Sequence, residues 1–157
     1  MKSTVYIETS IVSYLTARPS RDLVRAAHQR LTRSWWKARY DFSLFVSELV
    51  LRELAAGDPK AAKRRRRVAS SLPVLGVSDR HADLADAPVR GGVLPHATLV
   101  DAFHIALAAG HGMDYLLTWN CKHIANATTS STIEMICRSE GFEPPIICTP
   151  EELGKKA

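Results

Sequence analysis

The chain has 157 residues, 46% of them hydrophobic, which is enough for one domain with a substantial core. Charged or polar residues interrupt every apolar segment well before the ~20 residues that a membrane-spanning helix needs, so we expect no membrane-embedded segment. The formal net charge of +5 favours a polyanionic partner such as nucleic acid, although many basic proteins have none.

The first half of the chain predicts two strands and four helices. Residues 4–8 are apolar on both faces, as in a central parallel strand. A helix is expected from a Ser20 cap to about Ala38, with Leu23, Ala27, Leu31 and Trp35 near its buried face. The other predicted elements are a short helix over 9–16, a strand over 41–46, a helix over 47–56, and a helix that begins at 58–59.

The second half continues the alternation of strands and helices. The pattern predicts a strand over 73–77, a helix that starts over 78–84, a strong helix over 96–109 and a strand over 113–118. A helix over 133–139, an edge strand over 146–148 and a terminal turn over 149–152 follow. This order is typical of an α/β sandwich with a mostly parallel sheet. We expect residues 1–157 to form a single domain of this class.

Four side chains with oxygen atoms lie at the ends of predicted core elements, far apart in the sequence: Glu8, Glu53, Asp101 and Asn120. Ligands of open α/β sheets bind beyond the carboxyl ends of the strands, so these residues are expected to meet in one cleft. A carboxylate beside a core needs compensation, and no Lys or Arg is adjacent to Glu8 or Asp101. Oxygen ligands favour Mg²⁺ or Mn²⁺ over zinc. Capping or solvation explains any one acid more simply, but the four positions together favour a metal site.

Candidates for substrate contacts lie near these acids and in a basic run. Ser10 and Thr118 either hold a phosphate oxygen or cap a helix. His104 lies one helical turn from Asp101, either near the substrate or in a structural role. Six basic residues lie between positions 60 and 67, and they form either a phosphate-binding surface or a solvated helix face. This run includes Arg64, Arg65, Arg66 and Arg67.

Several other function classes lack their motifs. No GxGxxG or GxxxxGK[ST] sequence follows the first strand, no GxSxG sequence is present, and the six histidines lack zinc spacing. The three cysteines, Cys121, Cys137 and Cys148, lack CxxC spacing and are expected to be small buried side chains in a reducing compartment. The N-terminus enters a strand pattern directly, so we expect no signal peptide and a cytoplasmic location.

Four segments, taken together, resemble the PIN-domain family, particularly VapC-like toxins: VYIETS at 5–10, SELVLREL at 47–54, DAFHIA at 101–106 and LLTWN at 116–120. The resemblance implies a three-layer α/β/α sandwich and an acidic cluster that binds Mg²⁺ or Mn²⁺. It also implies cleavage of single-stranded RNA, a homodimer, and a small antitoxin protein as partner.

Position by position, Glu8 stands where the family usually has its first Asp, and Asn120 stands where another Asp is common. Glu53 and Asp101 match acidic positions of the family, and Glu48 is the alternative to Glu53. The leading hypothesis is therefore a Mg²⁺- or Mn²⁺-dependent ribonuclease with these four residues at its centre. Because Glu8 and Asn120 depart from the pattern, an inactive or weak PIN-like module that binds RNA or a protein is the alternative. A phosphohydrolase that acts on small phosphate esters is a third hypothesis.

Overall fold

The computed structural model describes residues 1–95 and 98–154, which contain one five-stranded parallel sheet. Its strand order is β3-β2-β1-β4-β5, and each neighbouring pair is parallel. The strands are β1 (Thr4–Ile7), β2 (Ser43–Ser47), β3 (Val74–Leu75), β4 (Tyr115–Leu117) and β5 (Ile146–Cys148). Strand β1 lies in the middle, where Val5, Tyr6 and Ile7 are 0% exposed, as its continuous apolar run predicts.

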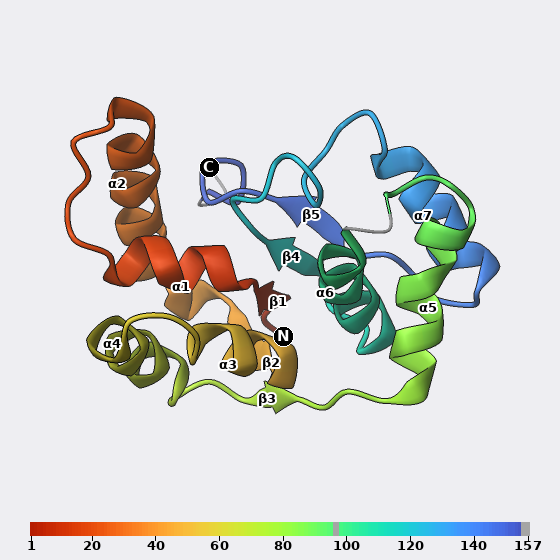
Figure 1. Ribbon diagram of the computed structural model, residues 1–157, viewed down its shortest axis with the longest axis horizontal. Helices are drawn as coiled ribbons and strands as arrows, with labels where there is room; N and C mark the ends of the chain where they lie inside the picture. Colours follow the sequence, from red (N-terminus) through yellow and green to blue (C-terminus); the bar gives the residue numbers. More distant parts are fainter. Residues whose placement is uncertain (96–97, 155–157) are drawn as a thin grey trace.

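Helices cover both sides of this sheet, which confirms the predicted α/β sandwich. They are α1 (Thr9–Thr16), α2 (Leu23–Lys37), α3 (Glu48–Leu54), α4 (Pro59–Ala69), α5 (Asp79–Arg90), α6 (Leu99–Gly110) and α7 (Ser130–Ser139), with a 3-10 turn at Arg39–Asp41. In Figure 1, α1, α2 and α4 lie at the left, α5 and α7 at the right, and the strands between them. Helix α1 packs against α2, α3 and α4, and α5 packs against α6 and α7.

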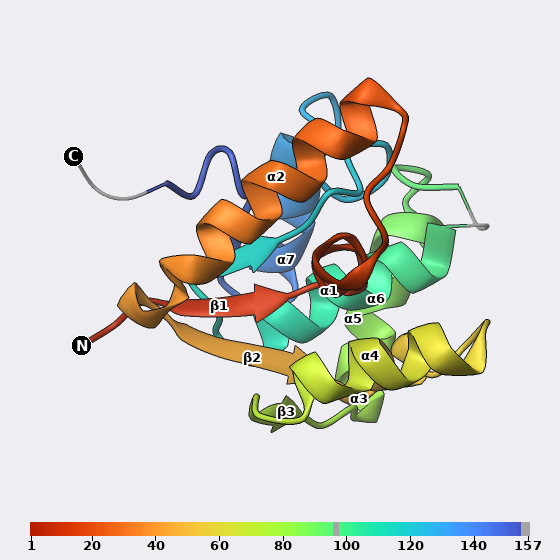
Figure 2. The same cartoon turned by 90° about the vertical axis from the view of Figure 1, so that its left-hand side faces the viewer.

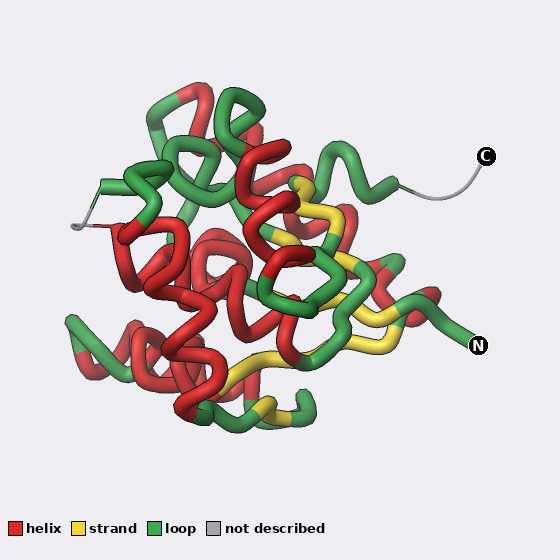
Figure 3. Tube along the Cα trace, turned by 90° about the vertical axis from the view of Figure 1, so that its right-hand side faces the viewer, coloured by secondary structure: helices red, strands yellow, loops and turns green. Residues whose placement is uncertain are grey.

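The carboxyl ends of the strands share one edge of the sheet. Figure 2 shows β1 and β2 running in the same direction, with β1 leading into α1 and β2 ending beside α3. The opposite view in Figure 3 shows helices in front of the strands. Because every strand pair is parallel, the residues that follow β1, β2 and β4 meet at the same edge.

Helix α2 differs from the prediction at its start and in its buried face. Its N-cap is Asp22, whose side chain accepts a hydrogen bond from the Arg25 N–H, whereas the Ser20 hydroxyl accepts one from the Asp22 N–H. The predicted apolar face is wrong in its first half, because Leu23 is 86% exposed and Ala27 is also exposed. Polar Gln29 and Thr32 are buried with Trp35 instead.

The burial of these two polar residues has a physical reason, because each has partners inside the protein. The Gln29 amide accepts from the Ser20 N–H at 3.0 Å and donates to the Arg18 carbonyl at 2.8 Å. The Thr32 hydroxyl accepts from the Trp119 indole N–H at 2.8 Å. Polar side chains are buried at little cost when they are paired in this way.

The second half follows the predicted order with shifted boundaries. Helix α5 runs from 79 to 90, in agreement with a helix that starts over 78–84, and β3 contains two residues instead of five. Helix α6 begins at Leu99; His96, the predicted start, lies outside the described residues. Cys137 and Cys148 are buried as expected, whereas Cys121 is exposed. Within the described ranges, no helix combines the length and apolar character needed to cross a bilayer.

Candidate metal centre

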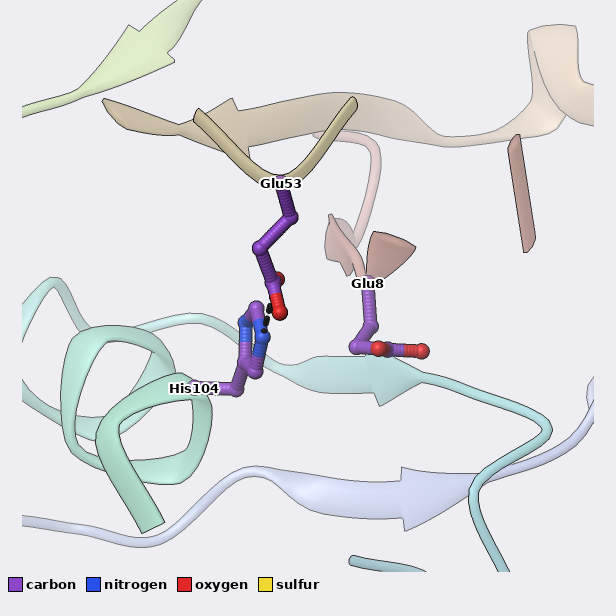
Figure 4. A group of neighbouring side chains, drawn as sticks. All are labelled: Glu8, Glu53 and His104. Atoms are coloured by element: carbon purple, nitrogen blue, oxygen red, sulfur yellow. Dashed lines mark ion pairs between the residues drawn. The ribbon is translucent and has the colours of Figure 1, made fainter. Parts of the chain in front are cut away.

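Two carboxylates and one imidazole meet at the carboxyl edge of the sheet. Glu8 directly follows β1 and is the N-cap of α1, Glu53 lies in the last turn of α3, and His104 lies in the middle of α6. One potential ligand atom from each of the three lies within 4.8 Å of the other two. Figure 4 shows the Glu53 carboxylate facing the His104 ring, with Glu8 beside them. The fold therefore brings together groups that are 45 and 51 positions apart in the sequence, from 8 to 53 and from 53 to 104.

Glu8 is held by its neighbours through one carboxylate oxygen. Its Oε2 accepts hydrogen bonds from the Ser10 N–H at 3.0 Å, from the Ser10 hydroxyl, and from the Thr118 hydroxyl at 2.8 Å. Among the described residues, no hydrogen bond reaches Oε1. Glu8 thus caps α1 and also leaves one oxygen for a ligand. Ser10 and Thr118, predicted as substrate contacts, are placed as supports of Glu8.

Glu53 receives two hydrogen bonds on its Oε1, from the Thr9 hydroxyl at 2.6 Å and from His104 Nε2 at 2.7 Å. Burial disfavours the charged form of this carboxyl. The hydrogen bond and charge of His104, together with the Thr9 hydrogen bond, outweigh burial and lower the pKa of Glu53 below its ordinary value. The side chain is therefore kept ionised, which is the form that a cation binds.

His104 lies behind Glu53, away from solvent. Its side chain is 1% exposed, and its Nδ1 lies 2.7 Å from the Tyr6 hydroxyl. Both ring nitrogens are thus engaged within the protein, and the ring is placed to support Glu53 rather than to contact a substrate directly. The sequence reasoning overlooked Tyr6, although a tyrosine in a fully buried strand needs a partner for its hydroxyl.

Asp101 and Asn120 form a second pair. The Asn120 amide nitrogen donates to Asp101 Oδ1 at 3.0 Å, and the Asn120 oxygen accepts from the His123 N–H at 3.1 Å. These partners set the orientation of the amide, because an N–H must donate and a carboxylate must accept. Asn120 therefore turns its NH₂ group, rather than its oxygen, toward Asp101.

The Asp101 carboxyl lies outside the compact three-residue group but within its electrostatic reach. Burial raises the pKa of Asp101; the charges of His123 and His104 and the Asn120 hydrogen bond oppose this, while the charge of Glu53 adds to it. The structure thus places Glu8 and Glu53 together, with the Asp101–Asn120 pair near them.

Two further contacts define the surroundings of the site, and the first decides between Glu48 and Glu53. Glu48, the rival of Glu53, is exposed and accepts from the Val77 N–H at 3.1 Å, so it does not join the group at 4.8 Å. Trp119 stacks on His28 with ring centroids 3.9 Å apart and an interplanar angle of 11°. Trp119 therefore packs helix α2 against the loop that carries Asn120.

The basic run on α4 is divided between two roles. Arg65 donates to the carbonyls of Leu54 and Ala56, at the C-terminal end of α3 and just beyond it. These carbonyls lack partners within their own helix, so Arg65 satisfies acceptors that α3 leaves open. Arg64, Arg66 and Arg67 are exposed. Of the four predicted arginines, Arg65 is therefore committed to the α3 carbonyls, and the other three present their side chains at the surface.

The model of the PIN domain family matches residues 5–122, so the chain belongs to the PIN-domain family. No curated protein sequence matches the chain. Among solved structures, a toxin–antitoxin complex from Klebsiella pneumoniae is 19% identical with a TM-score of 0.58, over 93% of this chain and 97% of the other.

Two further solved structures have similar folds. VapBC2 from Rickettsia felis, bound to a promoter DNA fragment, is 12% identical with a TM-score of 0.57, over 93% of this chain and 98% of the other. VapC20 from Mycobacterium tuberculosis, a toxin that cleaves the sarcin-ricin loop, is 20% identical with a TM-score of 0.55, over 77% of this chain and 93% of the other. At these identities the likeness establishes the shared fold.

Proposed function

We propose that this protein is a divalent-metal-dependent endoribonuclease that cleaves single-stranded RNA as the VapC-like toxin of a toxin–antitoxin pair. The observation that carries the proposal is the meeting of Glu8, Glu53 and His104 within 4.8 Å at the carboxyl edge of a PIN-family sheet. The toxin–antitoxin complexes among the similar folds support the assignment to this class of PIN protein.

The residues present fit a hard divalent cation. Among residues 1–95 and 98–154, the hydrogen bonds to Glu8 and to Glu53 reach one oxygen of each carboxylate, so each retains an oxygen for coordination. Mg²⁺ and Mn²⁺ prefer such ligands, and both are commonly held by one or two carboxylates together with substrate phosphate. When bound, the ion supplies Lewis-acid chemistry: it polarises the scissile phosphate and stabilises the leaving oxygen.

The protein's own residues hold this arrangement and guide the RNA. Ser10 and Thr118 fix the Glu8 carboxylate, and Asn120 fixes Oδ1 of Asp101, which leaves Oδ2 of Asp101 to accept a hydrogen bond from water at the reacting phosphate. Exposed Arg64, Arg66 and Arg67 offer positive charge to the phosphate backbone. We propose that its partners are a small antitoxin protein and a second copy of this chain.

One observation favours a second candidate, a PIN module that binds RNA or a partner protein with little or no catalysis. Asn120 carries no charge and donates its NH₂ group to Asp101, so a cation would meet one negative charge fewer than with an Asp at this position. In this alternative the acidic site has lost most of its affinity for a divalent ion, and the basic surface of α4 retains RNA binding.

The test is cleavage of single-stranded RNA by the native protein with Mn²⁺, with Mg²⁺ and with EDTA. We expect metal-dependent cleavage that falls by about 100-fold or more in Glu53→Gln, since this change removes a proposed ligand charge. Glu48→Gln is the matched control: it changes the same residue type on the same helix but outside the cluster, and it should retain activity. Cleavage that survives EDTA and Glu53→Gln rejects the mechanism, whereas RNA binding without cleavage supports the alternative.

A further inference from the structure

A continuous chain of hydrogen bonds crosses the core and ends on Glu53. The Val50 N–H donates to Ser47 Oγ at 3.1 Å, and Ser47 Oγ lies 2.7 Å from the Tyr6 hydroxyl. The Tyr6 hydroxyl lies 2.7 Å from His104 Nδ1, and His104 Nε2 lies 2.7 Å from Glu53 Oε1. Ser47 and Tyr6 are 0% exposed and His104 is 1% exposed. The chain thus joins β2, β1 and α6 to the carboxylate on α3 without contact with solvent until its end.

The donors and acceptors along this chain are consistent with one direction. A backbone N–H can only donate, so Ser47 Oγ accepts from Val50 and has its own hydrogen available for Tyr6. A tyrosine hydroxyl carries its hydrogen at neutral pH, so Tyr6 can donate to His104 Nδ1. In the neutral ring the hydrogen then lies on Nε2, and a protonated ring also carries a hydrogen there. In either form Nε2 donates to the Glu53 carboxylate.

A purely structural explanation accounts poorly for this arrangement. Position 6 lies in the central strand and position 104 faces the core, where phenylalanine and leucine would pack without any need for partners. Ser47 also has a local structural role, because it caps α3 through the Val50 N–H. The Tyr6 hydroxyl and the His104 ring cap no helix, and a fully paired polar pair adds little stability over an apolar core. The chain ends instead on a single atom, Oε1 of Glu53, which His104 contacts directly and which Thr9 contacts from another side.

We propose that Ser47, Tyr6 and His104 are positioning residues that hold the Glu53 carboxylate through Oε1 and leave its Oε2 to coordinate the divalent ion. This inference rests on the proposed metal site. His104 is not a ligand itself, because both of its ring nitrogens are already engaged. Thr9 holds the same Oε1 from another side. Removal of such supporting hydrogen bonds typically weakens metal binding by about 10- to 100-fold.

The experiment measures Mn²⁺ affinity by titration calorimetry, independently of RNA cleavage. In His104→Leu the donor to Glu53 is lost, and affinity should fall by about 10- to 100-fold. In His104→Gln an amide NH₂ can occupy the place of Nε2, so affinity should stay near that of the native protein. In His104→Asn the shorter amide reaches only the place of Nδ1, and affinity should fall as in His104→Leu.

Tyr6→Phe tests the chain one step further back with a conservative change. It leaves Nδ1 of His104 without its donor, and Mn²⁺ affinity should fall by several-fold, on the order of the lower end of that range. Tyr115→Phe in neighbouring strand β4 is the matched control and should bind Mn²⁺ as the native protein does. Thermal unfolding of each variant in EDTA confirms that it is folded.

The outcomes separate this inference from the function on which it rests. If the native protein binds Mn²⁺ and His104→Leu and Tyr6→Phe bind it equally tightly, the chain is structural and the positioning role is overturned, while the metal site stands. Equal loss in His104→Gln and His104→Leu also overturns it, because the rescued donor then has no effect. If the native protein binds no Mn²⁺, the proposed metal site itself is overturned, and the positioning role with it.

Discussion

Replacement of Asn120 by Asp tests whether the Asn120 side chain donates a hydrogen bond to Asp101 at the site. The Asn120 amide nitrogen lies 3.0 Å from Asp101 Oδ1 and donates to it. In Asn120→Asp a carboxylate oxygen takes the place of this donor, so two negative charges face each other at the same separation. Without a metal ion the variant should be less stable than the native protein, and a divalent cation should reverse much of the loss.

The size of the effect follows from two contributions. A hydrogen bond to a charged group contributes about 1.5–3 kcal/mol, and the substitution removes it. Each carboxylate shares its charge between two oxygens, so the centres of charge lie farther apart than the nearest atoms. Two unit charges about 4 Å apart repel by about 4 kcal/mol at an effective dielectric constant of about 20, before screening by solvent. Both residues are half-buried, so solvent reduces the repulsion. We expect a net loss of about 2–4 kcal/mol of unfolding free energy, or roughly 5–10 °C in Tm for a chain of this size.

Thermal unfolding at low ionic strength, first in EDTA and then with Mn²⁺, measures this effect. Mn²⁺ should raise the Tm of Asn120→Asp more than that of the native protein, because the ion compensates two facing carboxylates in the variant. Asn126→Asp is the matched control: it adds the same charge in the same loop and keeps the oxygen that accepts from Thr128. It loses one exposed hydrogen bond, from the Asn126 amide to the Lys122 carbonyl, and should therefore lose about 1 kcal/mol or less. Equal stability of the two variants in EDTA would refute the described pairing of Asn120 with Asp101.

Three further predictions concern stability and charge. Arg65→Gln removes hydrogen bond donors to the carbonyls at the end of α3, and it should lower the free energy of unfolding by about 1–2 kcal/mol in urea titrations. Exposed Arg64 is the comparison: Arg64→Gln should leave stability unchanged and reduce the salt dependence of RNA binding by about one counterion. In Gly110→Ala the new Cβ would clash with the buried imidazole of His81 on α5, which should cost about 1–3 kcal/mol. Gly76→Ala is the comparison: its Cβ meets nothing within 4 Å, and it should cost less than about 0.5 kcal/mol. The folded-state pKa of Glu53 is lower than its ordinary value of 4.5, so its carboxylate contributes stability above that pH and loses it as the pH falls through the folded-state pKa. The stability advantage of the native protein over Glu53→Gln in EDTA should therefore shrink on acidification, and an advantage that stays constant would contradict the lowered pKa.

The sheet was predictable because its signals are local. The run at 4–8 is apolar on both faces, which only a strand covered on both sides tolerates, and helices alternate with such runs along the chain. A parallel sheet then places every strand end at one edge. This reasoning predicted that Glu8 and Glu53 would meet, and the structure brings them within 4.8 Å.

The interpretation of α2 failed because helical periodicity does not say which neighbours a helix has. Leu23 is apolar but lies at the exposed start of the helix, where it has no core to enter. Thr32 is polar but buried, because its hydroxyl meets the indole of Trp119, which is 87 positions away. Contacts over such separations are formed only by the assembled layers, and they override local preference.

The order of elements, the parallel class of the sheet and the choice of oxygen-bearing residues at its edge were determined by the sequence itself, since periodicity and residue type are properties of neighbouring positions. The tertiary structure alone decided what each polar atom faces. It turned the Asn120 amide toward Asp101, directed Arg65 onto α3, and set His104 behind Glu53. The physical reason is that a hydrogen bond depends on the distance and direction between two atoms, and only the packed layers specify these for groups far apart in the chain.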